Sequence, residues 1–444
     1  MAKDVVAEFE GYMARLGEGL GYSTRNQHLT EYCGGLMLPL KRKSVEPLAA
    51  EADPRNVPAK HQALLHFVGN APWSDRALLD RIQGYVEAHL RLEQGAFWIV
   101  DDTGHRKYGS ESVGVAHQYC GNLGKDDNCQ VAVSLSLASA RGSVPMDYRL
   151  YLPKSWAFDR KRRHKAHVPE EIVFQTKPEI ALAQIEAAQE RGVAPGVVIA
   201  DAAYGSDTAW REALTELGLP YALGVLSSTT VWPPGVKPLP PARYCGRGIV
   251  PTKLRRGPGH QPMSIKQLAL QLHASAWRVV TWREGTNKTL SSRFACVRVR
   301  AAHRDYQRTT MRAEEWLLIE WPRAEAEPLK YWLSSLPADT PLERLVDTAK
   351  MRWRIEHDYH ELKQEFGLSH YEGRGWRGFH HHATLCIAAY GFLTAQRLKE
   401  GSKKNADARP KTSSLSKDHQ PRSGRQSTAP RARLDSDAAI SNRL

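Results

Sequence analysis

The pattern of apolar and polar residues changes near residue 96. Before that point apolar residues recur at helical spacing, so residues 1–95 are predicted to be mainly helical. Phe97–Val100 is then a short continuous apolar run, which is typical of a buried central strand. Alternating residues at 129–137 and 146–152 predict two more strands, joined as a hairpin. Further strands are expected at 197–200 and 221–225, and helices at 178–191 and 207–217.

The pattern changes again after residue 225, where a Pro-rich stretch opens a second β-rich segment with strands expected at 277–282, 294–300 and 316–321. One long helix is predicted from Pro341 to about Phe366, and a second, apolar helix over 380–398. These changes predict five parts: a helical N-terminal region (1–95), the first part of a core (96–225), a basic β-rich insertion (226–330), the completion of the core (331–400) and a tail (401–444).

The positive charge is concentrated in two of these parts. The chain of 444 residues has a net charge of +14. Residues 226–330 hold 18 lysine and arginine residues against 7 acidic ones, and residues 401–444 hold 10 against 4. Such a surplus suggests a polyanionic partner. The tail is rich in Ser, Pro, Lys and Arg and lacks aromatic residues, so it is predicted to be a disordered basic segment.

Composition argues against membrane and secreted proteins. No uncharged apolar run reaches the ~18 residues that a membrane span needs, and the N-terminus has no apolar segment of a secretory signal. The six cysteines include no CxxC pair, which argues against a zinc ribbon or a disulfide framework. We therefore expect a cytoplasmic protein with no membrane partner.

The N-terminal region is a candidate for DNA binding. Pro72–Asp75 resembles a turn with a helix cap, followed by a predicted helix at 76–92. Two helices around such a turn form the helix-turn-helix of DNA-binding proteins. A plain helical hairpin is the simpler interpretation, because no recognition helix stands out.

Acidic residues follow two predicted strands, and a third lies on the predicted long helix. Asp101 follows strand 97–100, Asp201 follows strand 197–200, and Glu356 comes after the insertion. This order of strands, helices and acids is that of a ribonuclease-H-like core: a mixed sheet flanked by helices, here with a β-rich insertion and a helical N-terminal region. Three converging carboxylates can hold two Mg²⁺ ions, which prefer oxygen ligands and assist phosphodiester cleavage. For either aspartate alone, a polar strand end is the simpler interpretation.

Asp102 is the alternative to Asp101 as the first metal ligand. The two residues are adjacent on one strand, so their side chains point to opposite faces and only one should bind metal. Asp101 is our choice, with Asp102 in reserve.

Basic residues accompany Glu356 on the predicted helix. Arg352, Glu356 and Lys363 lie on one helical face, where the two cations could contact phosphates on either side of a metal-bound glutamate. The alternative is a solvated face with i,i+4 ion pairs such as Arg352–Glu356.

Three blocks carry a resemblance to a known family. They are Asp101–Gly104 with Lys107 and the following 112–131, then Ala200–Gly205, and Arg352–Glu356 continuing through Lys363 to 370–380. On these blocks the chain resembles a bacterial insertion-sequence transposase of the DDE superfamily, in the branch with a β-strand insertion domain. The resemblance implies that Asp101, Asp201 and Glu356 are the catalytic metal ligands for two Mg²⁺ ions, which Mn²⁺ can replace.

The same resemblance implies how DNA is held. Lys107, Arg352 and Lys363 would contact phosphates, and a tryptophan of the insertion would stack on a flipped base. Trp282 is our choice for that tryptophan, with Trp232 and Trp277 as alternatives. The implied partners are double-stranded DNA (the terminal inverted repeats of the element and the target) and a second copy in a homodimer. The implied location is the nucleoid of the bacterial cytoplasm.

One position departs from the family pattern. Many relatives carry a Tyr–Arg–Glu–Lys signature, and Ala349 stands here at the position of the tyrosine. The absence of this tyrosine affects how the terminal phosphate of the DNA is expected to be bound, but not the expected metal site. Two other functions stay open: a ribonuclease-H-like nuclease or resolvase without strand transfer, and a decayed, non-catalytic DNA-binding repressor.

Overall fold

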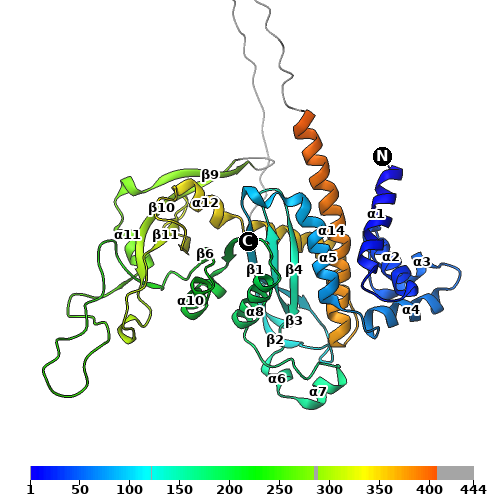
Figure 1. Ribbon diagram of the computed structural model, residues 1–444, viewed down its shortest axis with the longest axis horizontal. Coiled ribbons are helices and arrows are strands. Elements are labelled where there is room, and N and C mark those ends of the chain that lie inside the picture. Colours follow the sequence, from blue (N-terminus) through cyan, green and yellow to red (C-terminus); the bar gives the residue numbers. More distant parts are fainter. Residues whose placement is uncertain (1, 122, 285–288, 408–444) are drawn as a thin grey trace, which may run out of the picture. The chain divides into compact units, whose positions relative to one another are not determined.

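The computed structural model of the chain describes residues 2–121, 123–284 and 289–407 (Figure 1). Residues 1–401 form one compact unit. Of the second unit, 402–444, the description covers only the end of the last helix, up to Asp407. The predicted disordered tail therefore lies outside the described residues from 408 onward.

Helices fill the described part of the N-terminal region, as predicted. They are α1 (Ala2–Gly17), α2 (Ser23–Met37), α3 (Val45–Ala52), α4 (Val57–Gly69) and α5 (Asp75–Leu90), followed by a 3₁₀ turn, η1 (Leu92–Gln94). The expected cap precedes α5, where the Ser74 hydroxyl accepts a hydrogen bond from the amide of Ala77 at 3.1 Å. This cap satisfies one of the free amides that begin every helix.

Six strands build the core sheet: β1 (Phe97–Arg106), β2 (Ala116–Cys120), β3 (Lys125–Ala138), β4 (Ser143–Leu150), β5 (Val197–Ala200) and β6 (Tyr221–Gly224). β3 pairs antiparallel with β1, and β2 and β4 pair antiparallel with β3. On the other side of β1, β5 and then β6 run parallel to it. A mixed sheet of this order, flanked by helices, confirms the predicted ribonuclease-H-like fold class.

Helices connect and cover these strands. They are α6 (Lys154–Ala157), α7 (Arg160–Lys165), α8 (Lys177–Glu190), α9 (Ala202–Gly205), α10 (Thr208–Glu216) and the long α14 (Trp376–Asp407). α14 lies beside α5 (Figure 1), and Gly391 permits this approach because a Cβ there would stand 2.9 Å from Cγ2 of Ile82. None of the helices in the described part of the chain has the length and apolar character that crossing a membrane requires.

The basic segment after residue 225 adds strands to the same sheet. Its elements are β7 (Thr230–Trp232), β8 (Met263–Ser264), α11 (Ile265–Gln271), η2 (Ala274–Ala276), β9 (Arg278–Glu284), β10 (Thr289–Ala301), η3 (Asp305–Gln307), β11 (Glu315–Glu320) and β12 (Lys330–Ser334). β12, which the sequence pattern did not predict, pairs with β11 on one side and with β6 on the other. The sheet therefore continues from the core strands into the segment without interruption.

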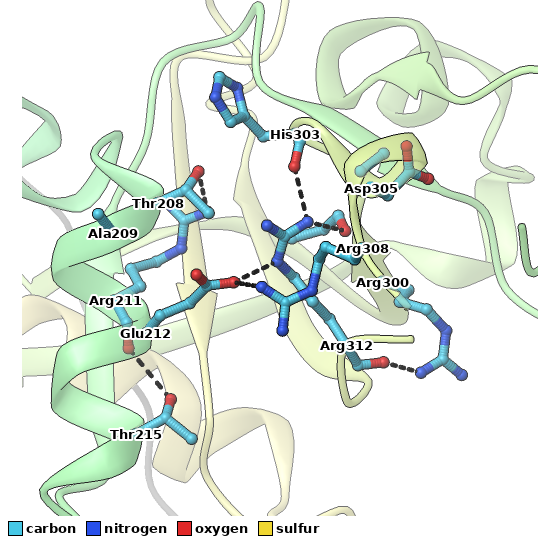
Figure 2. A network of polar contacts seen from close by, with 12 residues as sticks. Thr208, Ala209, Arg211, Glu212, Thr215, Arg300, His303, Asp305, Arg308 and Arg312 are labelled. Atoms are coloured by element: carbon cyan, nitrogen blue, oxygen red, sulfur yellow. Dashed lines mark hydrogen bonds and ion pairs between the residues drawn. The ribbon is translucent and has the colours of Figure 1, made fainter. Parts of the chain in front are cut away.

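A polar network fastens the loop between β10 and β11 to the core helix α10 (Figure 2). One carboxylate oxygen of Glu212 accepts from Arg308 Nη1 and from Arg312 Nε, both at 2.7 Å. Arg312 also donates to the carbonyl of His303 at 2.7 Å. On the same helix, Arg211 donates to the carbonyl of Gly205 in α9. This network connects the insertion loop, through α10, to the short helix that follows Asp201.

The long helix predicted for 341–366 is instead two helices, and the single-helix prediction is wrong. α12 (Leu342–Lys350) is followed by Met351 and Arg352, and α13 (Trp353–Gln364) begins after them. The apolar side chains of α12 pack with Val280, Phe294 and Trp332 of the insertion strands, whereas those of α13 join the main core. The break lets each half bury its own apolar face against a different part of the sheet.

We expect Gly205→Val to destabilise the protein. A Cβ at Gly205 would collide with the carbonyl oxygen of Gly224 in β6, so backbone would have to move. Overpacking of this kind costs about 1–3 kcal/mol, and urea denaturation monitored by circular dichroism will measure the loss. Gly84→Ala is the control: a Cβ there meets nothing within 4 Å on the exposed face of α5, so it should leave stability unchanged or slightly raised.

Candidate active site

The pairing of β1 with β5 brings Asp101 and Asp201 to the same level of the sheet. Ile99 is aligned with Ile199 in the parallel register, and Asp101 in β1 and Asp201, the residue directly after β5, each follow two positions later. Aligned residues of parallel strands point to the same face, and neighbouring strands are ~4.8 Å apart. The two carboxylates that the sequence predicted thus project together.

The backbone after β5 holds Asp201 close to β6. Asp201 caps α9, and its Oδ1 accepts a hydrogen bond from the amide of Ala203 at 2.9 Å. Two glycines allow the close approach: a Cβ at Gly205 would meet the Gly224 carbonyl, and a Cβ at Gly224 would stand 3.0 Å from the amide nitrogen of Ala202. The position of Asp201 is therefore set by backbone contacts rather than by side-chain packing.

Buried polar contacts fix the helix that carries Glu356. Asp358 of α13 is buried and accepts hydrogen bonds from the hydroxyls of Ser143 in β4 and Tyr390 in α14, both at 2.6 Å. Tyr359, also buried, is hydrogen-bonded to Ser134 of β3. Burial raises the pKa of Asp358 to about 6, and these hydroxyl donors oppose the increase. Glu356 itself faces outward, with a side chain 62% exposed.

Arg352 joins two of the three predicted acids. Its Nη1 donates to Asp101 Oδ2 at 2.8 Å, and its Nη2 donates to Glu356 Oε1 at 2.7 Å. The i,i+4 pair with Glu356 that the sequence analysis offered as the simpler interpretation is thus present. The same guanidinium also reaches Asp101 on the central strand, which a purely solvated helix face would not do.

The electrostatics of the site centre on Asp101. Burial raises the pKa of Asp101 to about 7. The positive charge of Arg352 lowers this pKa, whereas the neighbouring Asp201 and Asp102 raise it further. A carboxylate in this position therefore gains from any cation placed beside it.

Asp102 is engaged elsewhere. Its Oδ2 accepts from Lys177 Nζ at 2.6 Å, at the start of α8. Asp101 instead contacts Arg352 and, through Oδ1, the amide of Asp102. The two adjacent acids thus have different cationic partners, and the choice of Asp101 over Asp102 stays a prediction.

The three acids line one cavity of about 480 Å³, called here the acid cavity. It is formed by Asp101, Asp102, Thr103, Tyr119, Gly121, Asp201, Arg352, Glu356, Tyr359, His360, Lys363 and Gln364. As these side chains stand, no three His, Cys, Asp or Glu residues of the described chain are grouped closely enough to hold a metal ion. Three carboxylates from separate elements nevertheless suit a hard divalent cation. Such an ion would replace the guanidinium that now lies between Asp101 and Glu356.

The two predicted phosphate-binding lysines form internal hydrogen bonds. Lys363 is buried at the acid cavity and donates to the carbonyl of Gly104 at 3.1 Å, and burial lowers its pKa to about 8. Lys107 donates to the carbonyl of Tyr371 at 2.7 Å; burial lowers its pKa too, and it does not line the acid cavity. The structure thus brings Arg352 and Lys363 to the acids and places Lys107 away from them.

A second cavity of about 660 Å³ adjoins the first and shares Asp201, Arg352 and Glu356 with it. We call it the aromatic cavity, because Trp282, Trp332 and Trp353 line it together with Leu290, Lys350 and Ala349. The two other candidate tryptophans lie elsewhere. Trp232 is fully buried and donates to Asp305 at 2.5 Å, and Trp277 packs edge-on against Trp321.

Lys350 and Trp353 line the aromatic cavity, although neither was predicted as a site residue. Lys350 Nζ stands 4.3 Å from the centre of the Trp282 ring and pairs with Glu320 at 2.7 Å. It holds the indole in the wall of the aromatic cavity by a cation–π contact. The only available signal was their proximity to Arg352 in the sequence.

Comparisons with known proteins give two matches. A family model described as DDE superfamily endonuclease matches residues 15–289, more than half of the chain. The match includes Asp101 and Asp201 and ends before Glu356. A probable transposase for insertion sequence element IS701 from Microchaete diplosiphon is 32% identical over 197 residues, which cover 44% of this chain and 47% of that protein. The chain thus spans about half the length of this curated relative.

We expect Asp358→Ala to destabilise the protein by about 2–4 kcal/mol, because it leaves the buried hydroxyls of Ser143 and Tyr390 without their acceptor. Thermal and urea unfolding will measure the loss. His357→Ala, at the exposed neighbouring position of the same helix, should change the free energy of unfolding by no more than about 0.5 kcal/mol. Equal effects of the two substitutions would contradict the anchoring role of Asp358.

Proposed function

The chain belongs to the DDE superfamily of endonucleases, and we propose that it is a transposase that cuts DNA at the ends of a mobile element and joins those ends to target DNA. The observation that carries this proposal is the convergence of three carboxylates from β1, β5 and α13 on one cavity. The relative named a probable transposase supports the same function.

Asp101, Asp201 and Glu356 would hold two Mg²⁺ ions, or Mn²⁺ in their place. When bound, such ions activate the attacking oxygen and stabilise the leaving oxygen of a phosphodiester. The protein's part is to orient these three ligands from separate rigid positions on β1, directly after β5 and on α13. No nucleophilic side chain is needed, because water attacks first and the freed 3′-hydroxyl attacks the target.

Arg352 has a second task once it leaves the carboxylates. Because it lines both cavities, its guanidinium can turn to a DNA phosphate in either one while remaining at the head of α13. Arginine offers a planar fork of donors that matches phosphate oxygens. Lys363 adds positive charge at the same cavity, and Lys107 would act farther along the strand.

The aromatic cavity suits a base taken out of the duplex. Trp282 would stack on this base, with Trp332 and Trp353 as further walls. Ala349 lines the same cavity at the position where relatives carry tyrosine, so the space that a phenol ring would fill stays open in this chain. This assignment makes residues 226–330 an insertion domain that contributes Trp282 to the site.

The proposed substrates are double-stranded DNA of the element's terminal inverted repeats and of the target. The surplus of cations in 226–330 supports contact with a polyanion. Synapsis of two ends calls for a homodimer, and DNA as the substrate places the protein in the bacterial cytoplasm with the nucleoid.

We expect Asp101→Asn, Asp201→Asn and Glu356→Gln to abolish cleavage of supercoiled plasmid carrying the element ends while leaving DNA binding intact. Each variant removes one carboxylate ligand, and chelation of divalent ions by EDTA should have the same effect, reversed by Mg²⁺ or Mn²⁺. Asp102→Asn is the matched control and should retain cleavage, since Asp102 pairs with Lys177. Unchanged cleavage in all three acid variants would refute the assignment of these acids, whereas DNA binding without any cleavage by the wild-type protein would favour a non-catalytic repressor.

Strand transfer separates a transposase from a nuclease of the same fold. With a pre-cut end carrying a free 3′-hydroxyl and a target plasmid, the wild-type protein should form covalently joined products in Mg²⁺, detected by gel mobility and sequencing of the junctions. Glu356→Gln should form none. Efficient cleavage of ends without joined products would indicate a nuclease or resolvase.

A further inference from the structure

An exposed basic surface lies outside the site described above, on the segment between β4 and α8. Residues 154–167 contain six lysine and arginine residues and a single acidic residue, Asp159. Arg160, Lys161 and Lys165 of α7 are exposed, and so is Arg374, just before α14. These four residues are called here the α7 patch. Acidic and basic residues nearly balance over residues 96–225, so the net charge of that segment does not indicate this basic surface.

The segment is held in place by its own contacts, so the exposed cations stand on a fixed support. Asp159 caps α7 by accepting from the amide of Arg162 at 3.0 Å. Arg163 donates to the carbonyls of Ile172 at 2.6 Å and Pro169 at 2.9 Å. The guanidinium of Arg162 stacks 3.8 Å from the centre of the buried Trp156 ring. Arg162 and Arg163 therefore stabilise the segment itself, whereas these contacts do not involve the four patch residues.

A cavity of about 430 Å³ opens at the patch. Lys161, Arg162, Lys165 and Arg374 line it, together with Trp156 and Glu111. Glu111 pairs with Lys165 at 2.5 Å, but both side chains are largely exposed, at 47% and 73%, so the pair is weak and easily exchanged for another anion. The hollow thus presents a positive surface of the kind that phosphate oxygens fit.

The chain connects this patch directly to the acid cavity. β1 carries Asp101 and continues for five more residues to Arg106, a distance of about 17 Å at ~3.3 Å per residue. The following loop places the carbonyl of Ser110 2.9 Å from Arg162 Nη2. Tyr108, which lies in the chain between Arg106 and Ser110, is 92% exposed, and the guanidinium of Arg106 is 5.1 Å from the centre of its ring. A duplex cut at Asp101 would need to extend only several base pairs to reach the patch.

We propose that the α7 patch is a second DNA-binding surface, which holds phosphates of duplex DNA away from the cleaved bond without reading its bases. The inference rests on the proposed function, because that function brings DNA to the neighbouring acid cavity. Flexible lysines and arginines on an exposed helix bind phosphates as point charges, so the contact is independent of sequence and sensitive to salt.

The test is the salt dependence of binding to a 40-bp duplex of arbitrary sequence, measured by fluorescence anisotropy in EDTA so that no cleavage occurs. The triple variant Arg160→Ala/Lys161→Ala/Lys165→Ala should weaken binding by about 10- to 100-fold at 150 mM salt, and the negative slope of log K against log salt should become smaller in magnitude by about 2–3. The charge-preserving variant Arg160→Lys/Lys161→Arg/Lys165→Arg should bind as the wild type does, provided that both variants show the wild-type melting temperature.

The matched control is Arg15→Ala/Arg55→Ala/Arg344→Ala, which removes the same charge from three exposed positions on separate segments outside residues 226–330. It should weaken binding less than about threefold. If it weakens binding as much as the patch variant does, or if the patch variant binds as the wild type does, the second surface is refuted. Cleavage assays with Asp101→Asn decide the proposed function separately: loss of cleavage there, with no effect of the patch variant, would leave the transposase standing and remove only the patch.

Discussion

Carboxylates that converge in a half-buried cavity repel one another, and in this protein the guanidinium of Arg352 offsets that repulsion. It contacts Asp101 on the central strand and Glu356 on α13, and so joins two elements that are far apart in the sequence. Loss of the guanidinium without another cation would leave negative charges unpaired at the centre of the site. The contact thus links the geometry of the acids to the start of α13.

The fold class and two of the acids could be predicted because their signals are local. A continuous apolar run ending in an aspartate marks both β1 and β5, and the register of these strands follows from the sheet that such runs form. The break between α12 and α13 could not be predicted in this way. The sequence of 341–366 is helical throughout, and the interruption arises because the two halves pack into different apolar clusters.

The hydrogen-bond partners of individual lysines could not be predicted from the sequence either. The sequence predicted that Lys107 and Lys363 would face a ligand, yet their ammonium groups donate to the carbonyls of Tyr371 and Gly104, which are 264 and 259 residues away in the chain. No periodicity encodes such a contact. The position of Trp282 likewise depends on contacts between distant elements, such as that of Lys350 Nζ with its ring. It also depends on β12, whose apolar run is too short to predict a strand from the sequence.

The alignment of β1 with β5 has a consequence for how such a chain can diverge. The pairing of residues 97–99 with 197–199 holds the segments that carry the two aspartates beside each other, whatever the length of the connecting chain. Loops and helices between them can therefore gain or lose residues over generations without disturbing that spacing. Glu356 lacks such protection, because its placement depends on the packing of a helix. Substitutions in the distant hydrophobic interior would therefore displace Glu356 first, even in a sequence that keeps all three acidic residues.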